Sequence, residues 1–347
     1  MTTLRTLTQY LLRVGAGASG PDLAQIMSAV SVSVKLTAAS VSRGPLILDL
    51  DAGEVPTEMQ LRSGLRRMAI KWLQSQTEGM EQLAGISVSG SSVIRQVSPT
   101  GRYLLLFDPM HGTGNLVDNL PVGSAFAIFK RDVDGPCTAE DFMQLGTNMI
   151  AAGLAIYGPR TTLILSTGDG VDGFTLDRDV GNFVLTHPKM VIPVGRPVFA
   201  INAAEAPYWP SPVKRYVEEC ILGVDGPRGR DFVMRWNASA LLGSYRVMNS
   251  GGLFLLPDTG KGDAWLAPLL HNAIPLAFLA EQAGGRATTG YQRVLEVLPD
   301  SLTSAVPLFF GCSSEVNLIQ SYFTEYDQKD DFVFEHPLFN NRTLFTD

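Results

Sequence analysis

The chain has 347 residues, with 27 Lys and Arg against 34 Asp and Glu, a formal net charge of −7. Its 45% hydrophobic and 18% charged residues are the balance of a globular protein, which excludes a disordered or fibrous chain. No run of Lys or Arg offers a footprint for a phosphate backbone, so we expect no nucleic-acid partner. We find no apolar stretch near the ~18 residues of a membrane span and no signal-peptide core. The composition therefore predicts a cytoplasmic protein without a membrane partner.

Two amphipathic helices are predicted early in the chain, over 23–41 and 58–72, where apolar residues recur at helical spacing. A Gly-Pro-Asp start signal at 20–22 precedes the first helix. Short β-branched or aliphatic runs then alternate with Gly, Asp and Pro, which is typical of a sheet built largely from hairpins and short crossovers. The predicted strands are 93–97, 103–107, 125–129, 161–165 and 174–176.

Helices and strands alternate in the second half of the chain. We predict three helices, over 235–247, 275–283 and 315–323, and two strands, over 253–256 and 308–310. The change from strand-rich to alternating sequence places a domain boundary near residue 200. The predicted organisation is an N-terminal α+β domain over 1–200, a C-terminal α/β domain over 201–325 and a tail over 326–347.

Three segments carry the chemistry of the chain. At 105–115 a strand runs into a Gly-rich turn that reads Leu-Leu-Phe-Asp-Pro-Met-His-Gly-Thr-Gly-Asn. Backbone N–H groups in such a turn can hold a phosphate without a basic side chain. The candidate phosphate-binding residues of the turn are therefore Gly112, Thr113, Gly114 and Asn115. The other two segments are Met-Arg-Trp-Asn-Ala-Ser at 234–239 and Ala-Glu-Gln-Ala-Gly-Gly-Arg-Ala-Thr-Thr-Gly at 280–290.

Together these segments resemble class I fructose-1,6-bisphosphatases, within the metal-dependent, lithium-sensitive sugar and inositol phosphatases. The resemblance runs from about residue 20 to the end of the chain. A closing Pro-Leu-Phe at 337–339 is similar to the branch found in carbon-fixing bacteria. The resemblance implies an α/β fold, a sandwich of alternating helix and sheet layers, that acts on a sugar phosphate.

The family holds divalent ions in a cage of carboxylates, and most of that cage is replaced here. The family motif Asp-Pro-Leu-Asp-Gly-Ser-Ser-Asn keeps its first aspartate as Asp108, but its second is His111. The paired glutamates of the family correspond to the stretch 86–91, which has no acidic residue. A further family glutamate aligns with Asn272, and an aspartate that helps to activate water aligns with Arg62. Because Mg²⁺ prefers carboxylate oxygens, we expect no metal site, no cofactor and weak or absent Mg²⁺ binding.

The substrate side of the resemblance is mixed. Arg235 matches an arginine that the family sends across the dimer interface to the distal phosphate of the sugar, and Asn202 matches another residue of that site. Taken alone, Arg235 is most simply explained by an ion pair at a surface or an interface, but the Met-Arg-Trp context favours the family role. Leu256 and Leu266 replace a tyrosine and a basic residue of the family, so we expect weakened binding of a bisphosphate.

The resemblance also implies partners. A homodimer or homotetramer is expected, and Arg235 could complete the pocket of an active paralogue in a mixed oligomer. A nucleotide-inhibitor site is matched only in part, by Arg102, Tyr103 and Lys130.

His111 has more than one interpretation. It is a neutral replacement for a lost ligand, or it forms an acid/base pair with Asp108, or it is a transition-metal ligand. A site made of Asp108, His111 and His271 is disfavoured, because alternation along a strand turns His271 away if Asn272 faces the pocket. Three hypotheses follow: a sugar-phosphate-binding pseudoenzyme or regulatory subunit, a repurposed sugar-phosphate enzyme, and a residual fructose-1,6-bisphosphatase with altered ligands.

Overall fold

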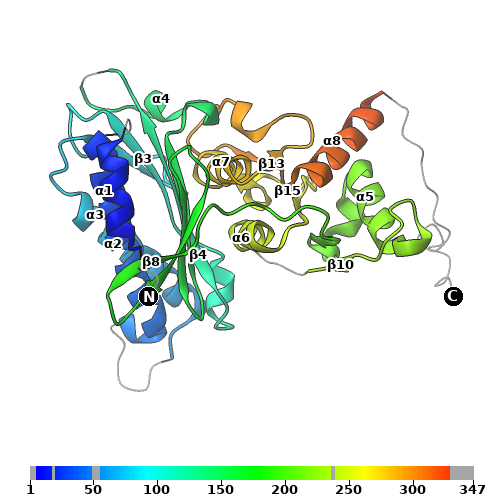
Figure 1. Ribbon diagram of the computed structural model, residues 1–347, viewed down its shortest axis with the longest axis horizontal. Helices are drawn as coiled ribbons and strands as arrows, with labels where there is room; N and C mark the ends of the chain where they lie inside the picture. Colours follow the sequence, from blue (N-terminus) through cyan, green and yellow to red (C-terminus); the bar gives the residue numbers. More distant parts are fainter. Residues whose placement is uncertain (1–4, 18–19, 49–54, 134, 236–238, 329–347) are drawn as a thin grey trace.

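Helices and sheets alternate in layers along the long axis of the molecule (Figure 1). The computed structural model describes residues 5–17, 20–48, 55–133, 135–235 and 239–328. Helices α1 to α3 cover one face of a large sheet, α6 and α7 lie between its other face and a smaller sheet, and α5 and α8 cover the outer face of that smaller sheet. The expected sandwich of alternating layers is confirmed.

The first helical layer contains the two predicted helices and one more. Its members are α1 (Leu7–Ala16), α2 (Gly20–Arg43) and α3 (Glu58–Thr77). The side chain of Thr57 accepts from the backbone of Gln60 and the Gln60 side chain accepts in return, a capping box that starts α3.

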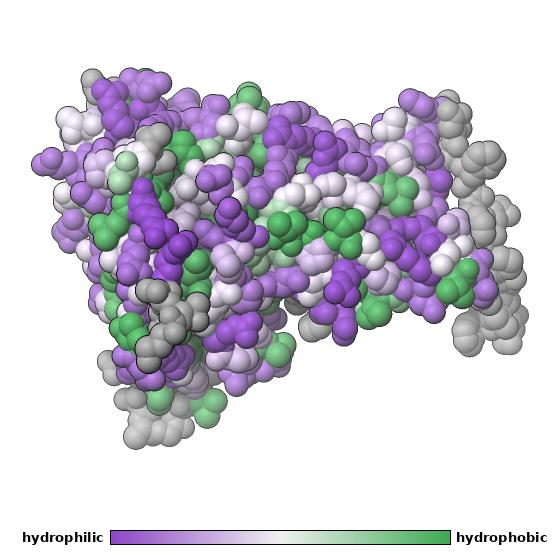
Figure 2. Space-filling view, viewed as in Figure 1, coloured by the Kyte–Doolittle hydropathy of each residue, from purple (hydrophilic) through white to green (hydrophobic). Residues whose placement is uncertain are grey.

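One expectation about α2 is wrong. The segment 20–47 is long and apolar enough to cross a membrane by length and composition, although no such stretch was expected. Half of its most apolar window is buried, and Leu23, Ile26 and Val30 join the core on the face of the large sheet. This burial is typical of a core helix in a globular protein. On the face shown in Figure 2, hydrophobic residues lie interspersed among hydrophilic ones.

The large sheet has eight strands in the order β2-β1-β3-β4-β5-β6-β7-β8. All pairs are antiparallel except β1 with β3, so hairpins dominate as predicted. The five predicted strands are present, but β1, β5 and β8 were not predicted. The strands are β1 (Leu83–Val88), β2 (Ile94–Gln96), β3 (Tyr103–His111), β4 (Val122–Lys130), β5 (Ala151–Tyr157), β6 (Thr161–Ser166), β7 (Asp172–Asp177) and β8 (Asn182–His187).

The smaller sheet has the order β10-β9-β11-β15-β13, and β12 pairs with β14 beside it. These strands are β9 (Val198–Ala200), β10 (Val233–Met234), β11 (Leu253–Leu256), β12 (Ala267–Pro268), β13 (Gly285–Thr288), β14 (Ala305–Val306) and β15 (Leu308–Cys312). The remaining helices are α4 (Ala139–Phe142), α5 (Ser211–Leu222), α6 (Ala240–Ser250), α7 (Ile274–Gln282) and α8 (Ser313–Asp327).

The helix predicted from residue 235 begins later than expected. Ser239 is the N-cap of α6, since its Oγ accepts from the backbone N–H of Leu242, and Arg235 instead directly follows β10. Residues 236–238 of the Met-Arg-Trp segment and residues 329–347 of the predicted tail lie outside the described residues.

A buried ion cluster stabilises the outer layer of the second half. Glu315 of α8 is 4% exposed and accepts from both Arg228 and Arg230, with Nη2 to carboxylate distances of 2.6 and 3.0 Å. The hydroxyl of Tyr216 on α5 donates to the same carboxylate at 2.6 Å. The cluster connects α8 and α5 to the segment that leads into β10 and Arg235.

Candidate functional site

The Gly-rich turn leaves the buried end of β3. Asp108 is 3% exposed, and the strand continues to His111 with an irregular register against β4. Gly112 follows with a φ of +75°, a conformation that a residue with a Cβ rarely adopts. A Cβ at Gly112 would also lie 3.1 Å from the side chain of Ser239, so the start of α6 rests on this turn.

Three groups surround the carboxylate of Asp108. The imidazole Nδ1 of His111 lies 3.0 Å from Oδ2, and Nδ2 of Asn272 donates to the same oxygen at 2.8 Å. The guanidinium of Arg66 on α3 lies 3.9 Å from Oδ1. Burial alone would raise the pKa of Asp108, but the hydrogen bonds from His111 and Asn272 and the charge of Arg66 outweigh it and lower the pKa. The carboxylate is therefore ionised and already engaged by protein groups.

The structure corrects the argument made about His271. Residues Leu269–Ala273 form a π-helical turn before α7, so strand alternation does not apply, and both His271 and Asn272 are buried. The Nε2 of His271 lies 3.1 Å from Oγ of Ser87 on β1. Burial lowers the pKa of His271 to about 4, which keeps its imidazole neutral at pH 7.

The groups around Asp108 do not fit a divalent magnesium ion. Mg²⁺ takes oxygen ligands, but here an amide N–H, an imidazole nitrogen and a guanidinium face the single carboxylate. The stretch that aligns with the paired glutamates of the family supplies Ser87 and Ser89 instead, and the carbonyl of Ser89 accepts a hydrogen bond from Arg66. Within the described ranges, no group of three His, Cys, Asp or Glu side chains is placed to hold a metal ion.

The turn itself uses part of its hydrogen-bonding capacity internally. The N–H of Asn115 donates to the carbonyl of Gly112 at 2.9 Å, and the side-chain amide of Asn115 donates to the carbonyl of Pro121 at 2.9 Å. Thr113 is half-buried and Gly114 is exposed. Phosphate binding by residues 112–115 stays a prediction.

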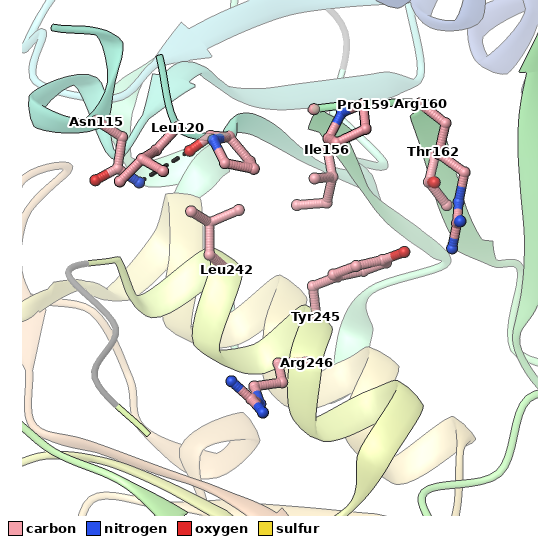
Figure 3. Close-up of a pocket in the computed structure, with 11 residues that line it drawn as sticks. Asn115, Leu120, Ile156, Pro159, Arg160, Thr162, Leu242, Tyr245 and Arg246 are labelled. Carbon is pink, nitrogen blue, oxygen red and sulfur yellow. Dashed lines mark hydrogen bonds between the residues drawn. The ribbon is translucent and has the colours of Figure 1, made fainter. Parts of the chain in front are cut away.

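A cavity of about 670 Å³ lies between the large sheet and α6 (Figure 3). Asn115 and Ile156 line its sheet side, and Leu242 and Tyr245 face them from α6. Arg160 lies at the sheet side as well. The cavity is continuous with the Gly-rich turn through Asn115.

The two predicted distal-phosphate residues leave the smaller sheet at neighbouring strand ends. β9 and β10 are parallel, and the N–H of Arg235 donates to the carbonyl of Phe199 at 2.8 Å. Asn202 follows β9, is exposed, and caps the next turn by accepting from the N–H of Ala204. Arg235 is also exposed. Their role in binding is not tested by this geometry and stays a prediction.

Two of the three residues proposed for a nucleotide site are in contact with each other. Tyr103 and Lys130 face each other across β3 and β4, and the Lys130 ammonium lies 5.4 Å from the centre of the Tyr103 ring. Tyr103 is 5% exposed, so the contact is chiefly part of the sheet.

Both halves of the chain match family models. The model for the N-terminal domain of fructose-1-6-bisphosphatase matches residues 5–188, and the model for its C-terminal domain matches residues 192–324. The chain belongs to the fructose-1,6-bisphosphatase family.

Relatives of the fructose-1,6-bisphosphatase family cover most or all of the chain. This chain is 39% identical to a class 1 fructose-1,6-bisphosphatase of Methylacidiphilum infernorum, over 98% of each chain. It is 46% identical to the class 1 enzyme of Hydrogenophilus thermoluteolus, over 74% of this chain and 71% of that one. Crystal structures of Leishmania major fructose-1,6-bisphosphatase in holo form and in T-state superpose with TM-scores of 0.80 and 0.79 at 30% identity. Each superposition covers 92% of this chain and 99% of the Leishmania major chain.

Two charged residues of the candidate site were not singled out by the sequence. Arg66 faces Asp108, and a signal was available in its position four residues after Arg62 on a predicted helix. Arg246 of α6 is a second missed cation: burial, and after it the like charge of Arg235, lower its pKa. No sequence pattern predicts that interaction, because it depends on how the chain folds between the two residues.

Proposed function

We propose that this member of the fructose-1,6-bisphosphatase family binds a sugar phosphate in the cytoplasm and lacks efficient metal-dependent phosphatase activity. The observation that carries the proposal is the environment of Asp108. Its carboxylate accepts from Asn272 and His111 and faces Arg66, with no second acidic side chain beside it; the absence of a neighbouring acid holds for the described part of the chain. A carboxylate whose Oδ2 already accepts from two protein groups, and whose Oδ1 faces a guanidinium, offers little to a hard cation.

Binding in this proposal rests on guanidinium and amide donors. Arg235 can contact a phosphate through two parallel N–H groups, and Arg246, whose pKa is lowered by burial and by the charge of Arg235, supplies a second positive charge. Asn202 retains donors on its side-chain nitrogen, since its oxygen caps the turn. Leu256 and Leu266 supply no such donors, so the affinity for a bisphosphate is lower than in an active enzyme.

An assay of phosphate release tests the proposal directly. The purified chain is incubated with fructose 1,6-bisphosphate and either Mg²⁺ or Mn²⁺, and binding of the same compound is measured by calorimetry. We expect binding without metal-dependent release of phosphate. Metal-dependent turnover would instead identify a residual fructose-1,6-bisphosphatase with altered ligands.

A second candidate function is supported by the contact between His111 and Asp108. The 3.0 Å distance from Nδ1 to Oδ2 lets the carboxylate orient the imidazole and leaves Nε2 for proton transfer. His111 is half-buried rather than enclosed. This repurposed enzyme would convert a sugar phosphate in the presence of EDTA, and His111→Asn would abolish the conversion.

We also propose that the chain forms a homodimer or homotetramer in which Arg235 lies near the pocket of a neighbouring subunit. Arg235 is exposed at the end of a short edge strand, where a partner can reach it. If Arg235 lies near the pocket of a neighbouring subunit, it could also complete the pocket of an active paralogue in a mixed oligomer. Such a twofold interface is expected to bury ~1,500 Å² or more. Light scattering at micromolar concentration is expected to report the mass of a dimer or tetramer, and a monomer would contradict the proposal.

A further inference from the structure

Two arginines of α3 lie against the Gly-rich turn. Arg62 and Arg66 are four residues apart and therefore share one face of the helix. A Cβ at Gly114 would lie 3.1 Å from Nη2 of Arg62, so the guanidinium lies on the turn. Arg66 Nη1 lies 3.9 Å from Asp108, at the base of the same turn.

The two guanidinium groups differ in how fully they are engaged. Arg66 donates to the carbonyl of Ser89 and faces the buried carboxylate of Asp108, so most of its charge is compensated inside the protein. Arg62 forms an ion pair with Glu58, whose side chain is 50% exposed, and its buried Nε has no hydrogen-bond partner. An exposed carboxylate is held weakly, so an incoming dianion can displace Glu58 from Arg62.

We propose that Arg62 and Arg66 hold the phosphate of the bound sugar phosphate against the Gly-rich turn, and so supply the positive charge that divalent ions would supply in a carboxylate cage. This inference rests on the proposed binding function and names its charge carriers. Guanidinium groups match the geometry of phosphate oxygens and keep their charge at any physiological pH. The absence of a side chain at Gly114 lets the guanidinium of Arg62 lie directly against the turn.

The proposal orders the two arginines by importance. Arg62 contributes most of the binding, because Arg66 must also compensate Asp108. Replacing Glu58 by Gln removes the competing carboxylate and is expected to strengthen binding. Arg67, on the same helix but exposed and one position further round, is a matched control for the loss of a single positive charge.

Calorimetric titration with fructose 1,6-bisphosphate and with inorganic phosphate, each in EDTA and in excess Mg²⁺, tests the inference. We expect binding that EDTA does not weaken, a loss of about tenfold or more for Arg62→Gln, and little change for Arg67→Gln. Glu58→Gln is expected to bind more tightly than the unaltered chain. Arg66→Lys keeps a positive charge beside Asp108 and loses only the geometry of the guanidinium group. We expect this variant to bind fructose 1,6-bisphosphate more weakly than the unaltered chain.

Other outcomes separate this inference from the proposed function. Binding that requires Mg²⁺, or binding in EDTA that is unchanged in Arg62→Gln and Arg66→Lys, would overturn the role of the arginines while sugar-phosphate binding stands. Absence of binding in every buffer would overturn both.

Discussion

The side-chain amide of Asn272 donates to the carboxylate of Asp108 at 2.8 Å, joining two segments that are 164 positions apart in sequence. Both residues are buried, and Asp108 is held at the same oxygen by His111. An amide N–H at this position satisfies the carboxylate, whereas a second acid would repel it unless a cation lay between them. The neutral residue at position 272 therefore allows Asp108 to stay ionised without a metal ion.

Restoring one acid is not expected to restore activity. His111→Asp adds a carboxylate beside Asp108, but Asn272, Ser87 and Ser89 remain neutral, so the pair lacks the further ligands that Mg²⁺ needs. Phosphate release from fructose 1,6-bisphosphate in Mg²⁺ is expected to stay at background. Substantial turnover by this single variant would show that the charge argument is wrong.

Removal of Arg235 is expected to weaken sugar-phosphate binding. A charge-assisted hydrogen bond contributes ~1.5–3 kcal/mol, so Arg235→Ala should reduce the affinity for fructose 1,6-bisphosphate by about tenfold or more. Arg178→Ala, which removes one charge from the turn between β7 and β8, is the control. An unchanged affinity in Arg235→Ala would place the distal phosphate elsewhere.

The fold should lose stability in mild acid through His271. Burial lowers its pKa from the ordinary value of 6.5 to about 4, so the unfolded chain binds more protons than the folded one between these values. The contribution is fully present above pH 6.5 and is lost as the pH falls towards 4, on the order of 3 kcal/mol in all. Chemical denaturation at pH 7, 5.5 and 4.5 should show a smaller decline for His271→Gln than for the unaltered chain. His187→Gln, on the edge strand β8, is the control; equal slopes in all three proteins would refute the assignment.

The cluster around Glu315 should dominate the stability of the outer layer. Glu315→Gln leaves Arg228 partly buried without its carboxylate, and removal of one partner from a buried pair costs about 3–5 kcal/mol. Glu296→Gln is the matched control, because Glu296 pairs with Arg293 but its side chain is 58% exposed, and exposed pairs contribute ~1 kcal/mol or less. Equal losses of unfolding free energy in urea for the two variants would contradict this account.

Sequence patterns predicted the elements with a clear period or a clear boundary. The helices around Leu65 and Val316 and the strand at 253–256 have apolar residues at regular spacing or flanking glycines, and all are present. β5 was missed as a strand because it is buried on both faces and shows no alternation. The late start of α6 reflects Ser239, whose capping hydrogen bond fixes the first turn.

The residue types of the candidate site could be predicted from the sequence, but the contacts among their side chains could not. The sequence alone indicated that Asp108 had lost its acidic neighbours. It could not indicate that Asn272 and Arg66 would take their place, since those contacts depend on how α3 and the turn before α7 pack against β3. The π-helical turn at Leu269–Ala273 is a local irregularity without a sequence period, and it brings His271 and Asn272 to the same buried region.

Calorimetric titration of the chain with Mg²⁺, in the presence and absence of fructose 1,6-bisphosphate, tests the central claim most directly. If Asn272, His111 and Arg66 take the place of a metal ion at Asp108, no Mg²⁺ binding with micromolar affinity will be observed in either condition. Asp108→Asn would then leave the titration unchanged. Micromolar affinity for Mg²⁺ that is lost in Asp108→Asn would contradict the claim and return the chain to the metal-dependent phosphatases.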